Sequence, residues 1–344
     1  MSQSQTSVLP ENFRQILHRV GQALEEQRPL GREFDGVLDA LNGLEPSTMN
    51  TAEREIVNLA SLNRGRRKVP FLIRAFSRRI RDMDQLDQRS DLKFLFLFHR
   101  DGMVREQALR RISEPLPSAF LFAAVARRLN DWVPSVRQAA AECGTRCFAR
   151  TQADCIAQAA LPLLARENSW GRWSGERDIL AQAFARPDVG DALAMQLQVR
   201  TTGPLAKIMN YALRYDNLDR HLDMLARKAM QPAIRATAAQ ALIDGHAQWQ
   251  TGWTWAWIDK PMGLRRREPV FATRPLTGSS PRMQWVETCV ADRSAMVRRM
   301  ALDALIRHKV DQPEARRIAE PFLKDASAPV RERAEFIVNK TAVS

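Results

Sequence analysis

The sequence has few residues of the types that metal sites and redox chemistry use. It contains four cysteines, Cys143, Cys147, Cys155 and Cys289, and five histidines in 344 residues. No pair of cysteines is separated by two residues, and no set of Cys and His has the spacing of a zinc site. We therefore expect free, buried thiols in a reducing compartment, and neither a bound metal nor a cofactor.

Long apolar runs and targeting patterns are also missing. No segment reaches the roughly 18 consecutive apolar residues that a membrane-spanning helix requires, and the N-terminal residues lack the basic, apolar and small-residue order of a signal peptide. No glycine-rich phosphate loop, serine-hydrolase elbow or metal motif occurs. These absences predict a cytoplasmic protein without membrane contact, and they name no catalytic residue.

Among the basic residues, lysine is scarce. Lys and Arg together number 52 against 39 Asp and Glu, and 44 of the 52 are Arg. The net charge of +13 favours an acidic partner, and guanidinium groups suit paired hydrogen bonds to phosphate or carboxylate. At 45% hydrophobic and 26% charged residues, the composition is that of a folded protein.

One stretch, residues 64–81, has no acidic residue at all. The pattern predicts an amphipathic helix whose basic face either contacts a polyanion or an acidic protein, or is solvated and balanced by the aspartates that follow in 82–91. The candidate contact residues are Arg64, Arg66, Arg67, Lys68, Arg74, Arg78 and Arg81.

The most informative feature of the sequence is an internal repeat. Five segments share an apolar residue followed by Arg, with small or apolar residues four and seven or eight positions later. The pairs are Val104-Arg105, Val136-Arg137, Ile234-Arg235, Val297-Arg298 and Val330-Arg331. Successive pairs are separated by 32 or 33 residues, or by about two or three times that length. This period predicts stacked helical hairpins, in which the apolar residue is buried and the Arg points along the stack.

The pattern resembles the short HEAT repeat, the form also found in bilin lyases, with the order "DxxxxVRxxA". The resemblance implies an all-α fold, a right-handed α-solenoid of helical hairpins. It also implies that Arg105, Arg137, Arg235, Arg298 and Arg331 are structural and pair with inter-repeat aspartates, the candidates being Asp131, Asp292 and Asp325.

The repeats suggest how the chain is organised. Residues 1–63 carry helical patterns without the Val-Arg pair and are expected to cap the array. Residues 64–344 are expected to form the array, interrupted by an irregular insertion at about 245–283 rich in Trp and Arg. No clear repeat occurs near residue 170 or residue 265, which leaves the number of repeats open.

The insertion contains "WQTGWTWAWIDKPMGLRRREPVFATRP". Its tryptophans Trp249, Trp253 and Trp257 lie four residues apart, which predicts a helical stripe facing the core. Trp255 falls off that stripe and is a candidate contact residue together with Arg265, Arg266 and Arg267, since exposed aromatics beside arginines can stack on bases and bind phosphates. Residues 261–283 are expected to form a long loop.

Three functions remain open. The resemblance to HEAT proteins favours a non-catalytic scaffold that holds a protein partner. The alternative is nucleic-acid binding through 64–81 and 249–267. A third possibility is an alkylpurine DNA glycosylase, since such enzymes have HEAT-like repeats and hold the damaged nucleotide with a Trp and an Asp four residues later, as in Trp255 and Asp259.

Overall fold

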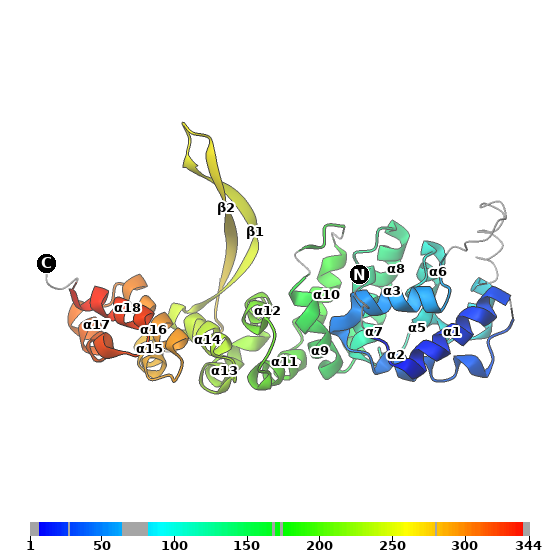
Figure 1. Cartoon of the computed structure of the whole chain (residues 1–344), viewed down its shortest axis with the longest axis horizontal. Helices are drawn as coiled ribbons and strands as arrows, with labels where there is room; N and C mark the ends of the chain where they lie inside the picture. The colour runs from blue at the N-terminus through cyan, green and yellow to red at the C-terminus, as the bar shows by residue number, and fades with distance from the viewer. Residues whose placement is uncertain are drawn as a thin grey trace, which may run out of the picture. The chain divides into compact units, whose positions relative to one another are not determined.

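A computed structural model describes residues 7–26, 28–63, 82–166, 169–172, 175–278 and 281–339. Helices predominate in these ranges, which confirms the expectation of a mainly helical chain, and the sheet they contain is one antiparallel pair of strands (Figure 1). The chain divides into two compact units, Met1–Phe184 and Ala185–Ser344. The basic stretch predicted as a helix, residues 64–81, lies outside the described residues.

The first unit is built from helices and short 3-10 turns. Its elements are α1 (Glu11–Glu26), η1 (Arg32–Phe34), α2 (Val37–Asn42), η2 (Pro46–Thr48), α3 (Met49–Leu59), α5 (Leu92–Phe96), α6 (Gly102–Arg110), α7 (Ala119–Arg128), α8 (Pro134–Cys147), η3 (Phe148–Arg150), α9 (Ala153–Leu164) and α10 (Glu176–Phe184).

The second unit contains the strands. Its elements are α11 (Pro187–Val199), α12 (Leu205–Ala212), η5 (Asp216–His221), α13 (Leu222–Lys228), α14 (Pro232–Asp244), β1 (His246–Asp259), β2 (Leu264–Pro275), α15 (Arg282–Val290), α16 (Ala295–Arg307), α17 (Gln312–Ala319), η6 (Glu320–Lys324) and α18 (Ala328–Asn339).

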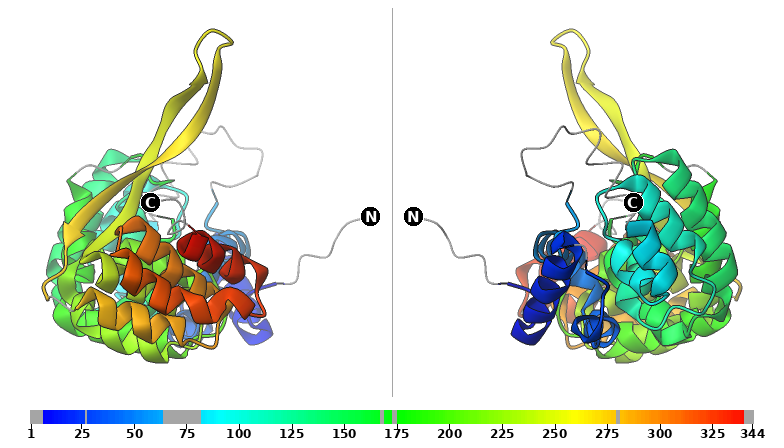
Figure 2. Two further views of the ribbon diagram at one scale, coloured as in Figure 1. Left: turned by 90° about the vertical axis from the view of Figure 1, so that its left-hand side faces the viewer. Right: turned by 90° about the vertical axis from the view of Figure 1, so that its right-hand side faces the viewer.

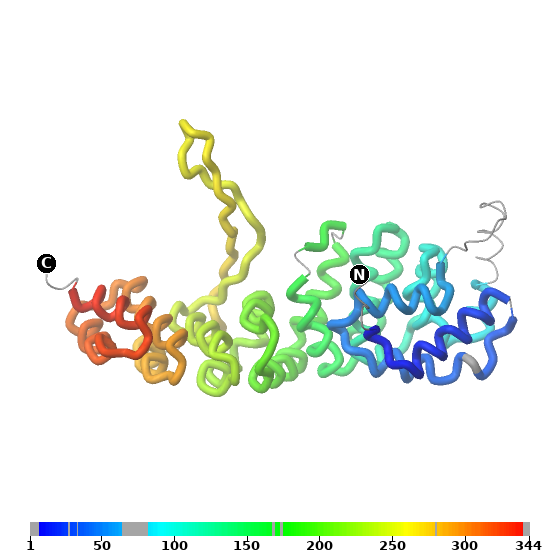
Figure 3. Tube along the Cα trace, in the orientation of Figure 1, coloured from blue at the N-terminus to red at the C-terminus, as the bar shows by residue number. Residues whose placement is uncertain are grey.

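Within each unit, helices pack against elements that lie close to them in the sequence. In the first unit α6 packs on α8 and α8 on α10, while α7 packs on α9. In the second unit α12, α14, α16 and α18 pack in that order, and α13, α15 and α17 lie against their chain neighbours. In the second unit, the trace in Figure 3 passes from one helix to the next toward the C-terminus. The apolar residues of the Val-Arg pairs are fully or almost fully buried, as are the alanines four positions later.

Three of the repeat arginines form an Arg–Asp ladder, in which each Arg donates to both carboxylate oxygens of the aspartate at the next Val-Arg segment. Arg235 donates to Asp292 at 2.8 Å through both Nε and Nη2, and the two corresponding distances from Arg298 to Asp325 are 2.7 and 2.9 Å. The third pair is Arg105 with Asp131.

Each ladder aspartate also accepts a backbone N–H two residues later in its own chain segment. Val133 N–H donates to Asp131 at 3.0 Å, and Asp292 and Asp325 accept in the same way from Ser294 and Ser327. Asp has a side chain short enough for this local bond, so one carboxylate fixes its own loop and binds the preceding repeat. Burial opposes ionisation of Asp131. The hydrogen bonds from Arg105 and the Val133 N–H, together with the charge of Arg105, nevertheless hold the pKa of Asp131 below its usual value.

The remaining two repeat arginines find other partners. The Nε atom of Arg137 lies 3.5 Å from Oε1 of Glu176 at the start of α10, so a glutamate stands where the next aspartate was expected. Arg331 belongs to the last repeat and donates to the carbonyl oxygens of Asp325 and Ala326 in its own loop.

Partly buried charges also join the N-terminal helices to α7 of the first unit. Glu53 on α3 pairs with Arg127 and Arg128 of α7, and Arg128 Nη1 reaches Asp131 Oδ2 at 3.1 Å. Burial opposes the charge on Glu53, yet the two arginines hold its pKa below the usual value. The region predicted as a cap is therefore tied to the Arg–Asp ladder through one carboxylate.

The tryptophan-rich insertion departs from its predicted structure. Residues 246–259 form strand β1, so the prediction of a helical stripe of Trp249, Trp253 and Trp257 is wrong. The prediction of a loop over 261–283 is also wrong, because 264–275 form β2 and α15 begins at Arg282. A shift in register at Thr251 places Trp249 opposite Ala272, and Trp253 opposite Pro269. Trp249 therefore lies on the other face of the strand from the later tryptophans.

The two positions without a clear repeat have different explanations. Near residue 170 the chain forms α9 and α10, which pack on each other and on α7 and α8 of the first unit. Near residue 265 there is no repeat: the hairpin is inserted between α14 and α15, and those two helices still pack together. Arg235 on α14 pairs directly with Asp292 just before α16, so the same type of Arg–Asp pair that joins the other Val-Arg segments spans the hairpin.

Candidate functional site

The hairpin of β1 and β2 rises away from the helices of the second unit in every view (Figures 1 and 2). The strands pair along their length, from His246 opposite Pro275 at the base to Asp259 opposite Leu264 near the tip. A two-stranded ribbon has no core of its own and is marginally stable in isolation. Its stability therefore depends on side-chain contacts along the ribbon and on the contacts at its base.

Three tryptophans and two arginines share one face of the ribbon, here called the Trp–Arg face: Trp253, Trp255, Trp257, Arg265 and Arg267. Trp255 lies opposite Arg267, and Trp257 opposite Arg265. The guanidinium carbon of Arg265 lies 5.3 Å from the ring centre of Trp255 and 5.2 Å from that of Trp257. Arg267 lies 5.3 Å from the ring centre of Trp253. Cations and indole rings thus alternate along the face.

These side chains are solvent-exposed, with 56% of Trp253, 59% of Trp255 and 51% of Trp257 accessible. A large indole normally buries most of its surface in a folded protein. Three neighbouring exposed indoles on one projecting element form an apolar surface that nothing within the described chain covers.

The third predicted arginine, Arg266, lies on the opposite face. It pairs with Ala256 across the ribbon, and its Nε donates to Oε1 of Glu268 at 2.7 Å. The run of three arginines thus separates into one that is neutralised by a neighbouring carboxylate and two that stack on indoles.

The tip of the hairpin is also apolar and exposed. Ile258, Met262 and Leu264 are exposed there. Asp259 Oδ1 accepts the backbone N–H of Met262 at 3.1 Å, and Gly263 takes a positive φ of 70° to close the turn. Asp259 therefore shapes the turn, and the structure places it at the tip of the ribbon instead of on a helix with Trp255.

At its base the hairpin is held by Arg274 of β2. This arginine donates to both oxygens of Asp219, at 2.8 and 2.6 Å, and to the carbonyl oxygens of Leu213 and Tyr215. Asp219 also accepts the backbone N–H of Thr277 at 2.9 Å. These bonds attach the base of the ribbon to the segment that follows α12.

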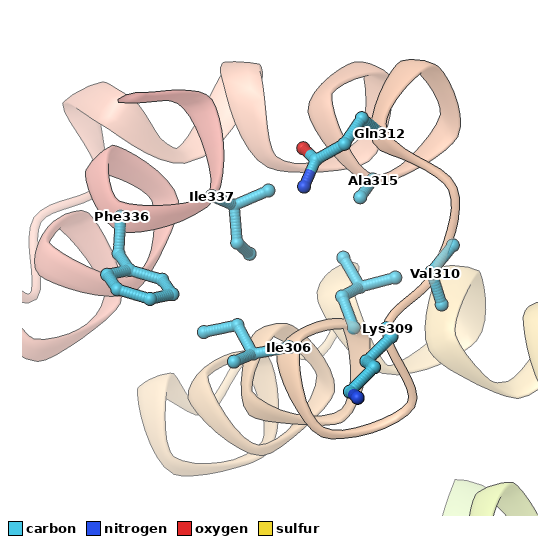
Figure 4. Close-up of a pocket in the computed structure, with 8 residues that line it drawn as sticks. Ile306, Lys309, Val310, Gln312, Ala315, Phe336 and Ile337 are labelled. Carbon is cyan, nitrogen blue, oxygen red and sulfur yellow. The ribbon is translucent and has the colours of Figure 1, made fainter. Parts of the chain in front are cut away.

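A hollow lies at the base of the hairpin between α12, α14 and the lower strands. It is lined by Asn210, Leu213, Thr237, Gln240, Ala241, Asp244, His246, Gln248 and Phe271. Its carboxylate, Asp244, already pairs with Arg307 at 2.8 Å and His308 at 2.6 Å. Another hollow lies among α16, α17 and α18 and is mainly apolar, with Gln312 and Lys309 at its margin (Figure 4).

The remaining sequence-based candidates fall elsewhere. Arg64, Arg66, Arg67, Lys68, Arg74, Arg78 and Arg81 lie outside the described residues. Within the described ranges, no three His, Cys, Asp or Glu side chains gather closely enough to hold a metal ion, and no helix has the length and hydrophobicity needed to cross a membrane.

Sequence reasoning singled out Trp255 and Arg265–Arg267 but missed the role of Trp253 and Trp257 as exposed residues. The signal was present, because Trp253, Trp255 and Trp257 alternate with small residues at the two-residue period of a strand.

Neither the protein-family models nor the curated proteins gave a match to this chain.

Proposed function

We propose that this chain is a HEAT-like α-solenoid that binds a protein partner without catalysis, and that the β1–β2 hairpin is its principal contact element. The stacked order of α12, α14, α16 and α18 and the Arg–Asp ladder support the solenoid arrangement. In such arrays each repeat contacts its neighbours, and the surface is available for binding.

The exposed Trp–Arg face carries the proposal. Protein interfaces are enriched in aromatic residues, Met and Arg and depleted in Lys, Asp and Glu, and Trp and Arg are the commonest residues at which truncation weakens binding. The ribbon from Trp253 to Phe271 presents three Trp, with Ile258, Met262, Leu264, Val270 and Phe271 also exposed. Large contiguous apolar surface on a projecting element is typical of an interaction site.

The polar groups near the hairpin support binding over catalysis. Asp259 is engaged by the backbone of the tip turn, and Asp244 is engaged by an arginine and a histidine. Both carboxylates thus hold local structure, Asp259 within the tip turn and Asp244 between α14 and α16.

The test is affinity capture from nuclease-treated lysate of the source cells. A shortened variant replaces residues 251–270 with Asn-Gly, which joins Gln250 to Phe271 through a two-residue turn and keeps the base of the hairpin. Wild-type protein should retain a stoichiometric protein that the shortened variant does not. The matched control is Trp132→Ala, which removes an exposed Trp of the first unit and should retain it.

Equal capture by the wild-type and shortened proteins would refute a contact through the hairpin. Nucleic acid is the second candidate, favoured by the two arginines stacked on indoles. Nucleic acid replaces protein as the partner if material is captured from untreated lysate but not after nuclease treatment, and if binding of an oligonucleotide weakens steeply with salt.

A further inference from the structure

We infer that the Trp–Arg face binds an extended acidic segment of the partner. Carboxylates at alternate positions of that segment accept hydrogen bonds from Arg265 and Arg267. The inference rests on the proposed function, because it names the chemistry of the partner at that same hairpin. It follows from the pairing of the arginines, their geometry and their spacing.

The first observation concerns charge. Most arginines of the second unit form an ion pair with a carboxylate. Examples are Arg266 with Glu268, Arg274 with Asp219 and Arg317 with Glu287. No carboxylate of the described residues lies within ion-pair distance of Arg265 or Arg267. The nearest acidic residue along β2, Glu268, lies on the opposite face with Arg266. The Trp–Arg face therefore carries two cations and no anion.

The second observation concerns orientation. The guanidinium carbon of Arg265 lies 5.3 and 5.2 Å from the centres of two indole rings, and that of Arg267 lies 5.3 Å from one. Attraction between each cation and its indole rings favours keeping both guanidinium groups on the Trp–Arg face. From there, their N–H groups can donate in pairs to a carboxylate of the partner.

The third observation concerns spacing. Arg265 and Arg267 are alternate residues of one strand, so their backbone positions are about 6.6–6.8 Å apart. An extended peptide repeats its same-face side chains at the same interval. Acidic residues two apart therefore match both arginines in register, and the side chains beside them contact the exposed indoles.

A protein segment fits this surface better than a nucleic acid does. Nucleic-acid binding relies on positive charge that follows the phosphate backbone. On the Trp–Arg face, Pro269 and Phe271 follow Arg267 toward the base, and Ile258 and Met262 are exposed at the tip beyond Arg265. A partner that lies along this face from base to tip covers apolar side chains on both sides of the two cations. An acidic segment flanked by apolar residues meets both requirements.

The experiment uses the full-length chain and two labelled peptides of equal length, one alternating Glu with Thr and the other alternating Gln with Thr. Binding is followed by fluorescence anisotropy and by quenching of tryptophan emission. The wild-type protein should bind the Glu peptide and not the Gln peptide, and higher salt should weaken binding. Arg265→Gln and Arg267→Gln should each lower the affinity about tenfold, the effect of one lost charge-assisted hydrogen-bonded pair.

The matched control is Arg266→Gln, which changes charge equally on the opposite face and should leave the affinity unchanged. Equal loss in all three variants, binding of the Gln peptide, or binding of a single-stranded oligonucleotide in place of the Glu peptide would each overturn the inference. Failure here is separable from failure of the proposed function. A partner that the double variant Arg265→Gln/Arg267→Gln retains, but the shortened hairpin loses, contradicts the acidic segment and leaves the hairpin contact standing.

Discussion

Arg105 donates to both carboxylate oxygens of Asp131, with Nη2–Oδ1 at 2.7 Å and Nε–Oδ2 at 3.0 Å. Both residues are almost completely buried. Arg105 also donates to the carbonyl oxygens of His99 and Arg100. Its guanidinium therefore holds both the loop before α6, its own helix, and the loop before α8. A buried charge with this many bonds is stable only while its partners remain.

Removing one member of this pair should destabilise the protein strongly. Arg105→Met leaves the buried Asp131 with one arginine fewer and should cost about 3–5 kcal/mol of unfolding free energy. Urea unfolding followed by circular dichroism measures the loss. Arg110→Met, which removes an exposed pair with Glu106, should cost less than about 1 kcal/mol. Similar losses in both variants would show that the buried pair contributes no more than a surface one.

The Arg–Asp ladder should also make the free energy of unfolding depend on pH in the acidic range. The pKa values of Asp131 and Asp292 are lowered although burial opposes it, since arginine and backbone N–H groups favour the charged form. Hydrogen bonding from Arg298 lowers the pKa of Asp325. A lowered carboxylate pKa contributes stability that is complete above the unfolded value of about 3.9 and is lost as pH falls through the folded value.

We therefore expect the unfolding midpoint in urea to fall steeply with acid below about pH 4. Asp292→Asn cannot titrate at this position, so its midpoint should be lower at neutral pH and should decline less on acidification. Parallel curves for the two proteins from pH 7 downward would contradict a contribution of Asp292 to the acid transition.

The Trp–Arg face should protect the ribbon from proteolysis. Trp255→Ala removes the indole that lies opposite Arg267 and beside Arg265, and each such contact at an exposed site contributes about 0.5–1 kcal/mol. Limited trypsin digestion, analysed by mass spectrometry, should show faster cleavage after Arg265, Arg266 and Arg267. Trp132→Ala should leave the cleavage rate unchanged, and the same rate in both variants would show that the indole does not hold the ribbon together.

Arg274 should determine how firmly the ribbon is held at its base. Arg274→Met removes two bonds to Asp219 and those to the backbone carbonyls of Leu213 and Tyr215, and it leaves the Trp–Arg face intact. Hydrogen exchange of the amides in 246–250 and 271–274 should accelerate about tenfold or more, which corresponds to the loss of one charge-assisted interaction. Arg266→Met serves as the control within the same strand, and unchanged exchange in the Arg274 variant would place the anchor elsewhere.

The helices that carry the Val-Arg pairs could be predicted from the sequence because their signature is local. The apolar residue, its Arg and the Ala four positions later lie on one helix, and the aspartate lies in the loop just before it. Burial of the apolar positions and the pairs Arg235–Asp292 and Arg298–Asp325 follow from that arrangement. Arg137 and Arg331 were the exceptions. The partner of Arg137 is Glu176, which lies outside any recognisable repeat, and Arg331 donates to backbone carbonyls of its own loop.

The hairpin could not be predicted in the same way. Strand prediction depends on alternation between a buried and an exposed face, and along the outer part of this ribbon both faces are open to solvent. Trp249, Trp253 and Trp257 are four residues apart, which is also the spacing of a helix. The register shift at Thr251, which puts Trp249 on the other face of the strand, leaves no mark in the sequence. Cross-strand contacts such as that of Arg265 with Trp257 depend on the register and leave no trace in the order of residues.

The hairpin leaves the helical array and returns to it at a single place. The backbone N–H of Leu276 donates to the carbonyl oxygen of Gly245 at 3.2 Å, and α14 and α15 pack on each other as if the intervening residues were a short turn. The ribbon beyond Gln250 and Phe271, outside the contacts that Arg274 makes at the base, can therefore vary in length and sequence without changing the packing of these helices. This junction is a natural grafting point: a longer arm, a different recognition strand or a reporter peptide can be exchanged there while the helices on either side keep their contacts.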